Sequence, residues 1–158
     1  MTDFLAGGGY QRWLSDLGTS DAPMTRAGLA TALNFFHAHM PTLPRPMQLA
    51  FLKGTDLHKP VRVIDLEPGD QLVAFRKYNE DPVKLFYSRA GTPMDRMGLN
   101  PSTREFNRFR VAVATKALES RCAPALDTWT DDRHYFQAQG GALQLIVPDA
   151  RKFLEWVG

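Results

Sequence analysis

The amino-acid sequence predicts an α+β fold, with N-terminal helices followed by a mainly β core. The chain has 158 residues, the size of one typical domain, and its 11 prolines and 12 glycines are spread along its length. Scattered prolines and glycines are typical of many turns and short strands. Apolar residues recur with helical spacing before Pro60 and alternate as in strands after it. We therefore expect a helical segment over 1–59 that packs on a core over 60–158, the two forming a single globular unit.

The helical segment is predicted from one periodic pattern and from the residues that bound it. Apolar residues recur there at intervals of three or four, namely Leu29, Leu33, Phe36 and Met40. They predict a helix of about four turns, capped by Thr25 and ending before Pro41. A short second helix over 47–53 should end at Gly54. The glycines at 7–9 predict either a tight loop or a linker that joins a larger protein.

Short apolar runs predict the strands of the core, at 61–66, 71–77, 83–87, 109–113 and 142–147. Turns at 67–70 and 79–82 separate the first runs, so the second and third strands should pair. The segment 88–103 is predicted to be an irregular loop, and loops of this length are often functional. A helix remains an alternative for 109–113, and a short helix is predicted over 150–157.

Charge, hydropathy and cysteine content exclude several classes of protein. The chain carries 19 basic and 17 acidic residues, and this net charge of +2 gives no strong field for nucleic acid. It has no apolar run of about 18 residues that would cross a membrane, and its start lacks the basic region of a signal peptide. The single Cys122 and the scattered histidines show no metal-ligand spacing. We expect no nucleic-acid partner, no membrane and no metal, while a Cys122 nucleophile stays an alternative.

Two features of the core indicate a binding site. Gly140-Gly141 stands at the entrance of the last predicted strand, where glycine lets a ligand approach the backbone, and Gln144 follows. A glutamine can orient a hydroxyl or a water without being ionised, but a bulged strand with a surface amide would give the same pattern. Arg76 ends a predicted strand, and its guanidinium suits a diphosphate. The alternative is a strand-end arginine in water.

These residues belong to three motifs in a fixed order along the chain. The motifs are Gly69-x-x-Leu72-x-x-x-Arg76, then Phe86-x-Ser88-x-Ala90-Gly91-Thr92-Pro93 with Arg96 downstream, then Gly140-Gly141-x-x-Gln144. Together they cover about 60–147, and they resemble the tuberculosis necrotizing toxin family of NAD glycohydrolases. The chain is also similar, more loosely, to the polymorphic-toxin domains carried by type VI and related effectors.

The resemblance implies a fold, a reaction and a set of site residues. The fold would be ADP-ribosyltransferase-like, with two small, mainly antiparallel β-sheets forming a cleft for NAD. The reaction would be hydrolysis of NAD or NADP to ADP-ribose and nicotinamide, with no cofactor beyond the substrate and no metal. Gln144 and Arg76 would be the catalytic residues, with Arg76 also holding the diphosphate. Phe86, Tyr87 and Ser88 would lie on the nicotinamide side. The other NAD-binding residues would be Thr92, Arg96, Gly140 and Gly141.

The resemblance also implies partners and a location. The chain would be a toxin or effector of interbacterial competition, neutralised by a cognate immunity protein. A larger delivery protein or a secretion system would carry it, secreted or injected, into the cytoplasm of a target cell. One alternative is ADP-ribosyl transfer to a protein or RNA, although the chain lacks a Glu-x-Glu pair. The other is a non-catalytic binding module or an immunity protein. The chain departs from the family near Asn107 and Arg108, where a histidine is expected.

Overall fold

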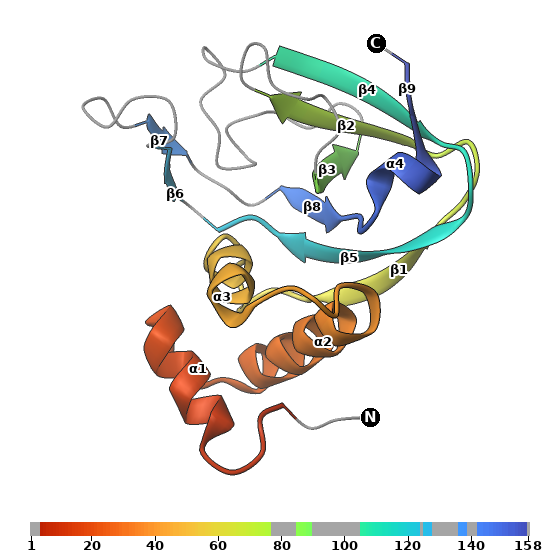
Figure 1. The fold of residues 1–158 in the computed structure, drawn as a ribbon. Helices are drawn as coiled ribbons and strands as arrows, with labels where there is room; N and C mark the ends of the chain where they lie inside the picture. Colours follow the sequence, from red (N-terminus) through yellow and green to blue (C-terminus); the bar gives the residue numbers. More distant parts are fainter. Residues whose placement is uncertain are drawn as a thin grey trace.

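Helices and an antiparallel sheet make up the observed fold. A computed structural model describes residues 4–76, 85–89, 105–123, 125–127, 136–138 and 142–157. The helices α1 (Gly9–Leu17), α2 (Pro23–His39) and α3 (Arg45–Lys53) precede the first strand and lie together on one side of the sheet (Figure 1). A short helix, α4 (Ala150–Phe153), lies on the other side. The predicted α+β fold with N-terminal helices is confirmed.

The main sheet has seven strands in the order β1-β5-β8-β3-β2-β4-β9, and every neighbouring pair is antiparallel. The strands are β1 (Arg62–Leu66), β2 (Gln71–Arg76), β3 (Phe86–Arg89), β4 (Glu105–Val111), β5 (Thr115–Arg121), β8 (Leu143–Ile146) and β9 (Leu154–Trp156). This corrects the expectation of two small sheets, because β3 pairs with β8 on one side and with β2 on the other. A separate two-stranded sheet contains β6 (Ala125–Asp127) and β7 (Phe136–Ala138).

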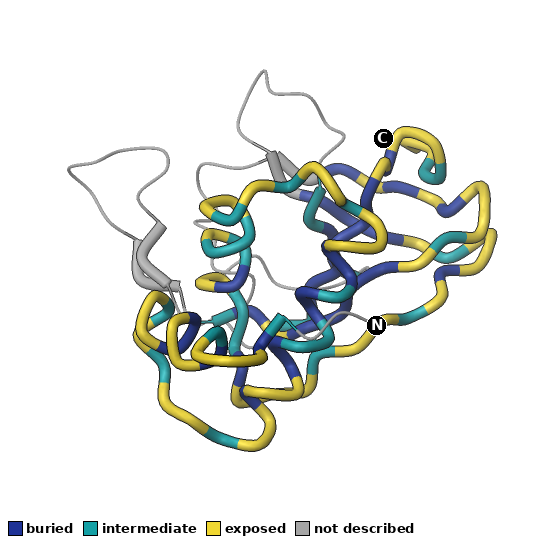
Figure 2. Tube along the Cα trace, turned by 60° about the horizontal axis from the view of Figure 1, so that its bottom comes forward, coloured by how far each residue is buried: buried dark blue, intermediate teal, exposed yellow. Residues whose placement is uncertain are grey.

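Two hydrophobic clusters lie on the two faces of the main sheet. The helix-side cluster is formed by α1, α2 and α3 with Leu118 and Ile146 of the sheet. The opposite cluster includes Tyr87, Phe109 and Leu145, together with a residue of α4. Successive side chains of a strand point to opposite faces, which is why Leu145 and Ile146 belong to different clusters. Figure 2 shows the buried residues along the strands and on the inner sides of the helices.

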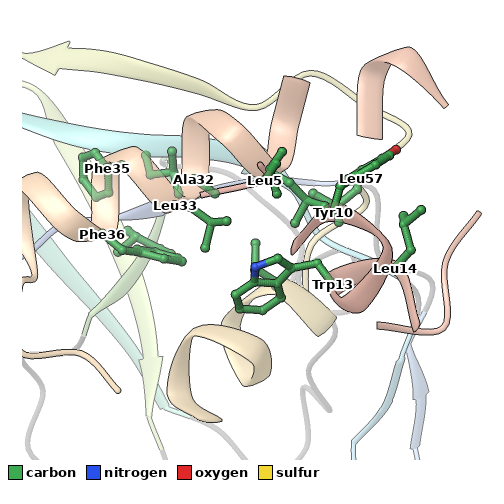
Figure 3. Packing of buried hydrophobic residues seen from close by; sticks show 13 residues of the cluster. Leu5, Tyr10, Trp13, Leu14, Ala32, Leu33, Phe35, Phe36 and Leu57 are labelled. Atoms are coloured by element: carbon green, nitrogen blue, oxygen red, sulfur yellow. The ribbon is translucent and has the colours of Figure 1, made fainter. Parts of the chain in front are cut away.

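The helix α1 begins directly after the glycines near the N-terminus. Gly7 has φ 57°, a left-handed conformation that glycine adopts without strain, so the chain turns tightly there. Trp13 of α1 and Phe36 of α2 pack in the helix-side cluster (Figure 3). The guanidinium carbon of Arg45 in α3 lies 3.7 Å from the centroid of a Trp13 ring, and Nη2 of Arg45 is 2.9 Å from Asp16. Arg45 therefore joins α1 to α3.

Replacing Arg45 with alanine should lower the free energy of unfolding by about 1–2 kcal/mol. The substitution removes a cation–π contact and a partly exposed ion pair, each of which contributes up to about 1 kcal/mol at such sites. Arg12→Ala is the matched control, because Arg12 is exposed and lies 3.9 Å from the same Asp16. Urea unfolding of both variants checks this. Equal stability of the two variants would show that the contact with Trp13 contributes nothing.

Several predicted element ends need correction. Thr25 is not a cap: α2 starts at Pro23, with Ala22 as its N-cap, and Thr25 is buried in the first turns. The helix predicted over 150–157 is correct only as far as Phe153, after which the chain forms β9. The strand β5 was not predicted at all. By contrast, the end of α3 at Gly54 and the turn at 67–70 are confirmed, and Gly69 has φ 97° in that turn.

Candidate functional site

Gln144 lies on β8, with its side chain on the face that the helices cover. Gln144 and Ile146 share this face because strand side chains alternate, and Ile146 belongs to the helix-side cluster. Gln144 is 7% exposed. Directly opposite it in the ladder is Ser120 of β5, which is also buried. The structure therefore shows a buried amide beside a buried hydroxyl, and the alternative of a surface amide is wrong.

The segment that follows α3 completes the surroundings of Gln144. The helix ends at Gly54, and the chain then runs beside the end of β5. The backbone N–H of Ala123 donates to the carbonyl oxygen of Gly54 at 3.0 Å. Thr55 and Cys122 form an isolated antiparallel bridge. These backbone contacts hold Gly54, Thr55 and Cys122 in place around the amide.

The carboxamide of Gln144 contacts polar groups of β5 and of the segment that follows α3. Its Nε2 lies 3.0 Å from Ser120 Oγ, 3.3 Å from Thr55 Oγ1 and 3.4 Å from the carbonyl oxygen of Gly54. Its Oε1 accepts from the thiol of Cys122, with Sγ at 3.3 Å. All of these groups are uncharged in their ordinary states. We call Thr55, Ser120, Cys122 and Gln144 the Gln144 cluster.

Cys122 is a hydrogen-bond donor in this cluster. Burial raises the pKa of its thiol to about 12, so the sulfur keeps its proton at neutral pH. A nucleophilic cysteine needs the opposite shift, because the thiolate is the reactive form. The environment of Cys122 therefore argues against a catalytic thiol and supports a structural S–H group.

The thiol of Cys122 should be almost unreactive in the folded protein. A rise of the pKa from 9.0 to about 12 lowers the thiolate fraction at about pH 8 roughly 1000-fold, and burial adds a steric barrier. Ellman's reagent should therefore react very slowly with native protein and rapidly after unfolding in guanidinium. The unfolded thiol ionises first, so this group should also reduce stability as the pH rises from about 9 towards 12. Rapid labelling of the native protein would contradict the buried placement.

The predicted residues of β3 divide between the two faces of the sheet. Phe86 packs in the helix-side cluster, with its ring centroid 5.1 Å from that of Phe51. Ser88 points to the same side, is fully buried, and donates its hydroxyl to the carbonyl oxygen of Leu143 at 3.2 Å. Tyr87 points to the opposite face, where its ring lies 5.2 Å from Phe109. The structure thus places Phe86 and Ser88, but not Tyr87, on the face of Gln144.

The other predicted site residues are only partly covered by the structure. Arg76 is the last residue of β2, and its backbone pairs with Glu105 of β4. Four predicted NAD-binding positions lie outside the described residues, namely Thr92, Arg96, Gly140 and Gly141. Gly141 directly precedes described residues that lead into Gln144.

The sequence did not identify the partners of Gln144 as functional residues. Thr55 and Ser120 carry no local motif, and they meet Gln144 only because α3, β5 and β8 converge. Two other buried polar residues were not assigned to the site. Glu119 forms an ion pair with Arg62 on the face opposite Gln144. Asn107 stands near the position of the expected histidine and is 3% exposed, and its Nδ2 has no hydrogen-bond partner among the residues that the structure describes.

In the part of the chain that the structure describes, no group of at least three His, Cys, Asp or Glu side chains could hold a metal ion. Within the same residues, no helix combines the length and apolar character needed to span a membrane.

Comparison with known proteins defines the class of this chain. The sequence profile of the bacterial toxin 46 family, Ntox46, matches residues 19–153. The chain therefore belongs to this family and is a bacterial toxin domain. The match favours the toxin over the alternative of an immunity protein. A link to the tuberculosis necrotizing toxin family is not shown and remains a resemblance of motifs.

Individual relatives place the chain near one toxin. It is 25% identical over 114 residues to the NAD(P)(+) glycohydrolase toxin Tse6 of Pseudomonas aeruginosa, a match that spans 66% of this chain and 26% of Tse6. The chain thus spans about a quarter of the length of this curated relative. The solved structure of Tse6 in complex with Tsi6 has a TM-score of 0.70 at 21% identity, over 87% of this chain and 99% of that one. This likeness shows that the fold is Tse6-like.

A second solved structure is more distant. It is that of Rhs1-CT in complex with its cognate immunity protein RhsI1, with a TM-score of 0.47 and 20% identity. The aligned region is 67% of this chain and 81% of that one.

Proposed function

We propose that this toxin domain hydrolyses NAD, and NADP as an alternative substrate, to ADP-ribose and nicotinamide. The similarity to a toxin named as an NAD(P)(+) glycohydrolase carries the proposal, because it extends over 114 residues of a chain with a Tse6-like fold. The Gln144 cluster supports it with a buried and uncharged set of hydrogen-bonding groups next to the Gly140-Gly141 motif.

The proposed chemistry needs fixed dipoles more than an ionised side chain. Nicotinamide leaves with the electron pair of its bond to ribose C1′, and the ribose acquires oxocarbenium character. Water then adds to C1′ and releases one proton to solvent. Preorganised neutral groups stabilise such a transition state without needing to reorganise, and holding the two reactants together lowers the barrier further. In this proposal Gln144 is the catalytic residue at the ribose.

The remaining residues would bind the substrate. Arg76 at the end of β2 is proposed to pair with the diphosphate, as guanidinium groups do. Phe86 and Ser88 lie on the same face as Gln144, and this supports their assignment to the nicotinamide side. The assignment of Thr92, Arg96, Gly140 and Gly141 rests on the motifs alone.

The biological setting is proposed from the same relatives. The solved Tse6 structure contains a partner chain, Tsi6. We infer that this domain has a cognate immunity protein that suppresses its activity in the producing cell. A delivery protein or secretion system would carry the domain into the cytoplasm of a target cell, where NAD is present.

The experiment that tests the proposed function is product analysis with purified wild-type protein. Incubation with NAD should give equal amounts of nicotinamide and free ADP-ribose by chromatography, and NADP should be tested in parallel. NAD labelled in the adenylate, added with cell lysate, separates hydrolysis from transfer, because transfer fixes the label in protein or RNA. A folded protein without turnover on either nucleotide would refute the proposed function.

A further inference from the structure

We propose that Gln144 acts on the substrate only as a hydrogen-bond acceptor, through Oε1. Thr55, Ser120 and Cys122 are then positioning residues that fix the orientation of the Gln144 amide. This inference rests on the proposed function and assigns a direction to the catalytic hydrogen bond. It also assigns a role in the reaction to three residues that no sequence motif singles out.

The orientation of the Gln144 amide follows from the partners and not from the amide itself. The hydroxyl of Thr55 donates its proton to the carbonyl oxygen of Phe51 at 3.2 Å, so Thr55 Oγ1 faces the amide as an acceptor. The carbonyl of Gly54 can only accept. Both therefore require the NH₂ group on their side. On the other side, the protonated thiol of Cys122 requires the carbonyl oxygen.

The cluster leaves one open hydrogen-bonding position on the amide. The NH₂ group of Gln144 has two hydrogens, and the acceptors on Gly54, Thr55 and Ser120 share them. Oε1 has two lone pairs, of which the Cys122 thiol uses one. The donors are thus committed. Among the residues that the structure describes, Cys122 alone donates to Oε1, so Oε1 can accept one more hydrogen bond. If the amide were rotated by half a turn, its carbonyl oxygen would face two other acceptors, the carbonyl oxygen of Gly54 and Oγ1 of Thr55. Each group left without a hydrogen bond would cost about 1–3 kcal/mol.

The open lone pair defines the group that Gln144 can bind. An acceptor binds an O–H or N–H donor. At the ribose, where Gln144 is proposed to act, the donors are the O–H groups of the attacking water and of the nicotinamide ribose. An acceptor does not recognise a phosphate oxygen or the carbonyl oxygen of nicotinamide, which are acceptors themselves. An amide carbonyl is too weak a base to take the proton, so Gln144 orients the O–H group while the proton leaves to solvent. Burial strengthens this hydrogen bond, because the local dielectric constant is low.

The first test compares two substitutions of similar size at Gln144. Burial favours the protonated form of a glutamate here, and this form keeps an acceptor oxygen while its O–H group donates towards Gly54, Thr55 or Ser120, so Gln144→Glu should keep kcat for NAD within about 10-fold of wild type. Methionine lacks a strong acceptor, so Gln144→Met should lower kcat at least about 100-fold with KM little changed. Thermal unfolding verifies that both variants are folded. A folded Gln144→Glu as inactive as Gln144→Met would overturn the proposal.

The second test concerns the positioning residues. Ser120→Ala and Thr55→Val should each lower kcat by about 3–10-fold with KM unchanged, because the amide gains freedom to turn. Thr25→Val is the matched control, since Thr25 is equally buried but lies on α2 and should leave kcat unchanged. Ser120→Thr, which restores a hydroxyl, should recover part of the loss. If Ser120→Ala and Thr55→Val both kept the wild-type kcat, the positioning role would be overturned. It would also be overturned if either substitution lowered kcat equally in a protein that already carries Gln144→Met, because the effect would then not act through Gln144.

Substrate analogues identify the source of the O–H group. If Gln144 holds a ribose hydroxyl, the effect of Gln144→Met should disappear on NAD analogues that lack the 2′- or the 3′-hydroxyl of the nicotinamide ribose. If it holds water, the effect should persist on both analogues. Absence of turnover by the wild-type protein would refute the proposed function itself. Turnover by the wild type together with an inactive, folded Gln144→Glu would refute only the acceptor assignment.

Discussion

Replacing Gln144 with alanine is expected to lower kcat for NAD hydrolysis by at least about 100-fold, the size expected for loss of one preorganised polar group at a reacting centre. The same change leaves Ser120, Thr55 and Cys122 without their shared partner. Stability should therefore also fall, by about 1–3 kcal/mol. Steady-state kinetics well below the unfolding temperature separates the two effects.

The control for this prediction is an exposed glutamine elsewhere in the chain. Gln11 lies on the solvent side of α1, so Gln11→Ala should leave both kcat and stability within error. If Gln144→Ala lost only stability and kept wild-type kcat, Gln144 would be a structural amide that joins α3 to the sheet. The catalytic assignment would then have to move to another residue.

Tyr87→Ala should cost about 3–5 kcal/mol of unfolding free energy, the largest stability effect that we predict. Its side chain is fully buried against Phe109, and removal of a core aromatic ring leaves a cavity. Tyr87→Phe keeps the ring and should recover most of this stability. Urea unfolding of both variants measures the difference, and Trp156→Ala is the control because Trp156 is 51% exposed.

Tyr87 also bears on the location of the substrate. The motif assigns it to the nicotinamide side, whereas the sheet directs its ring away from Gln144. We expect Tyr87→Phe to leave KM for NAD within about 2-fold of wild type, because a conservative substitution away from the substrate has only a small effect. A selective rise in KM, with stability preserved, would show that the substrate reaches the face opposite Gln144.

The helices were the easiest part of the fold to predict. Leu29, Leu33 and Phe36 repeat with the helical period, and their burial in α2 confirms the face that the pattern indicates. The helix α1 was missed, because it starts within a run of three glycines and Tyr10, Trp13 and Leu14 give only one short apolar stripe. Packing against α2 and α3, which no local pattern encodes, stabilises it.

The strand β5 shows why the sheet was only partly predictable. Its sequence, Thr-Lys-Ala-Leu-Glu-Ser-Arg, contains five residues that favour helices and has no clear alternation. In the structure it lies between β1 and β8 and is buried over four successive residues. Neighbours on both sides override its local propensity. The predicted pairing of β3 with β2 is confirmed, but its pairing with β8, which joins the two halves of the sheet, could not be inferred from the sequence.

The surroundings of Gln144 could not be predicted from the sequence, and its catalytic role stays a proposal. The pattern after the glycine pair predicted a strand, which β8 confirms, and Gln144 is buried there among polar groups. Thr55 and Ser120 lie 89 and 24 residues away along the chain, so their contact with Gln144 depends on the packing of α3 against the sheet. The direction of the Gln144 hydrogen bond depends on these partners and could not be inferred from the motif.

A structure of the protein with a hydrolysis-resistant NAD analogue shows directly whether Gln144 accepts a hydrogen bond at the reacting ribose. We expect the nicotinamide ribose, or the water poised to attack it, to lie about 2.6–3.2 Å from Gln144 Oε1. The contacts of Nε2 with Ser120 and Thr55 should be unchanged in the complex. A ribose bound on the opposite face of the sheet, with Oε1 still in contact with Cys122 alone, would contradict this expectation.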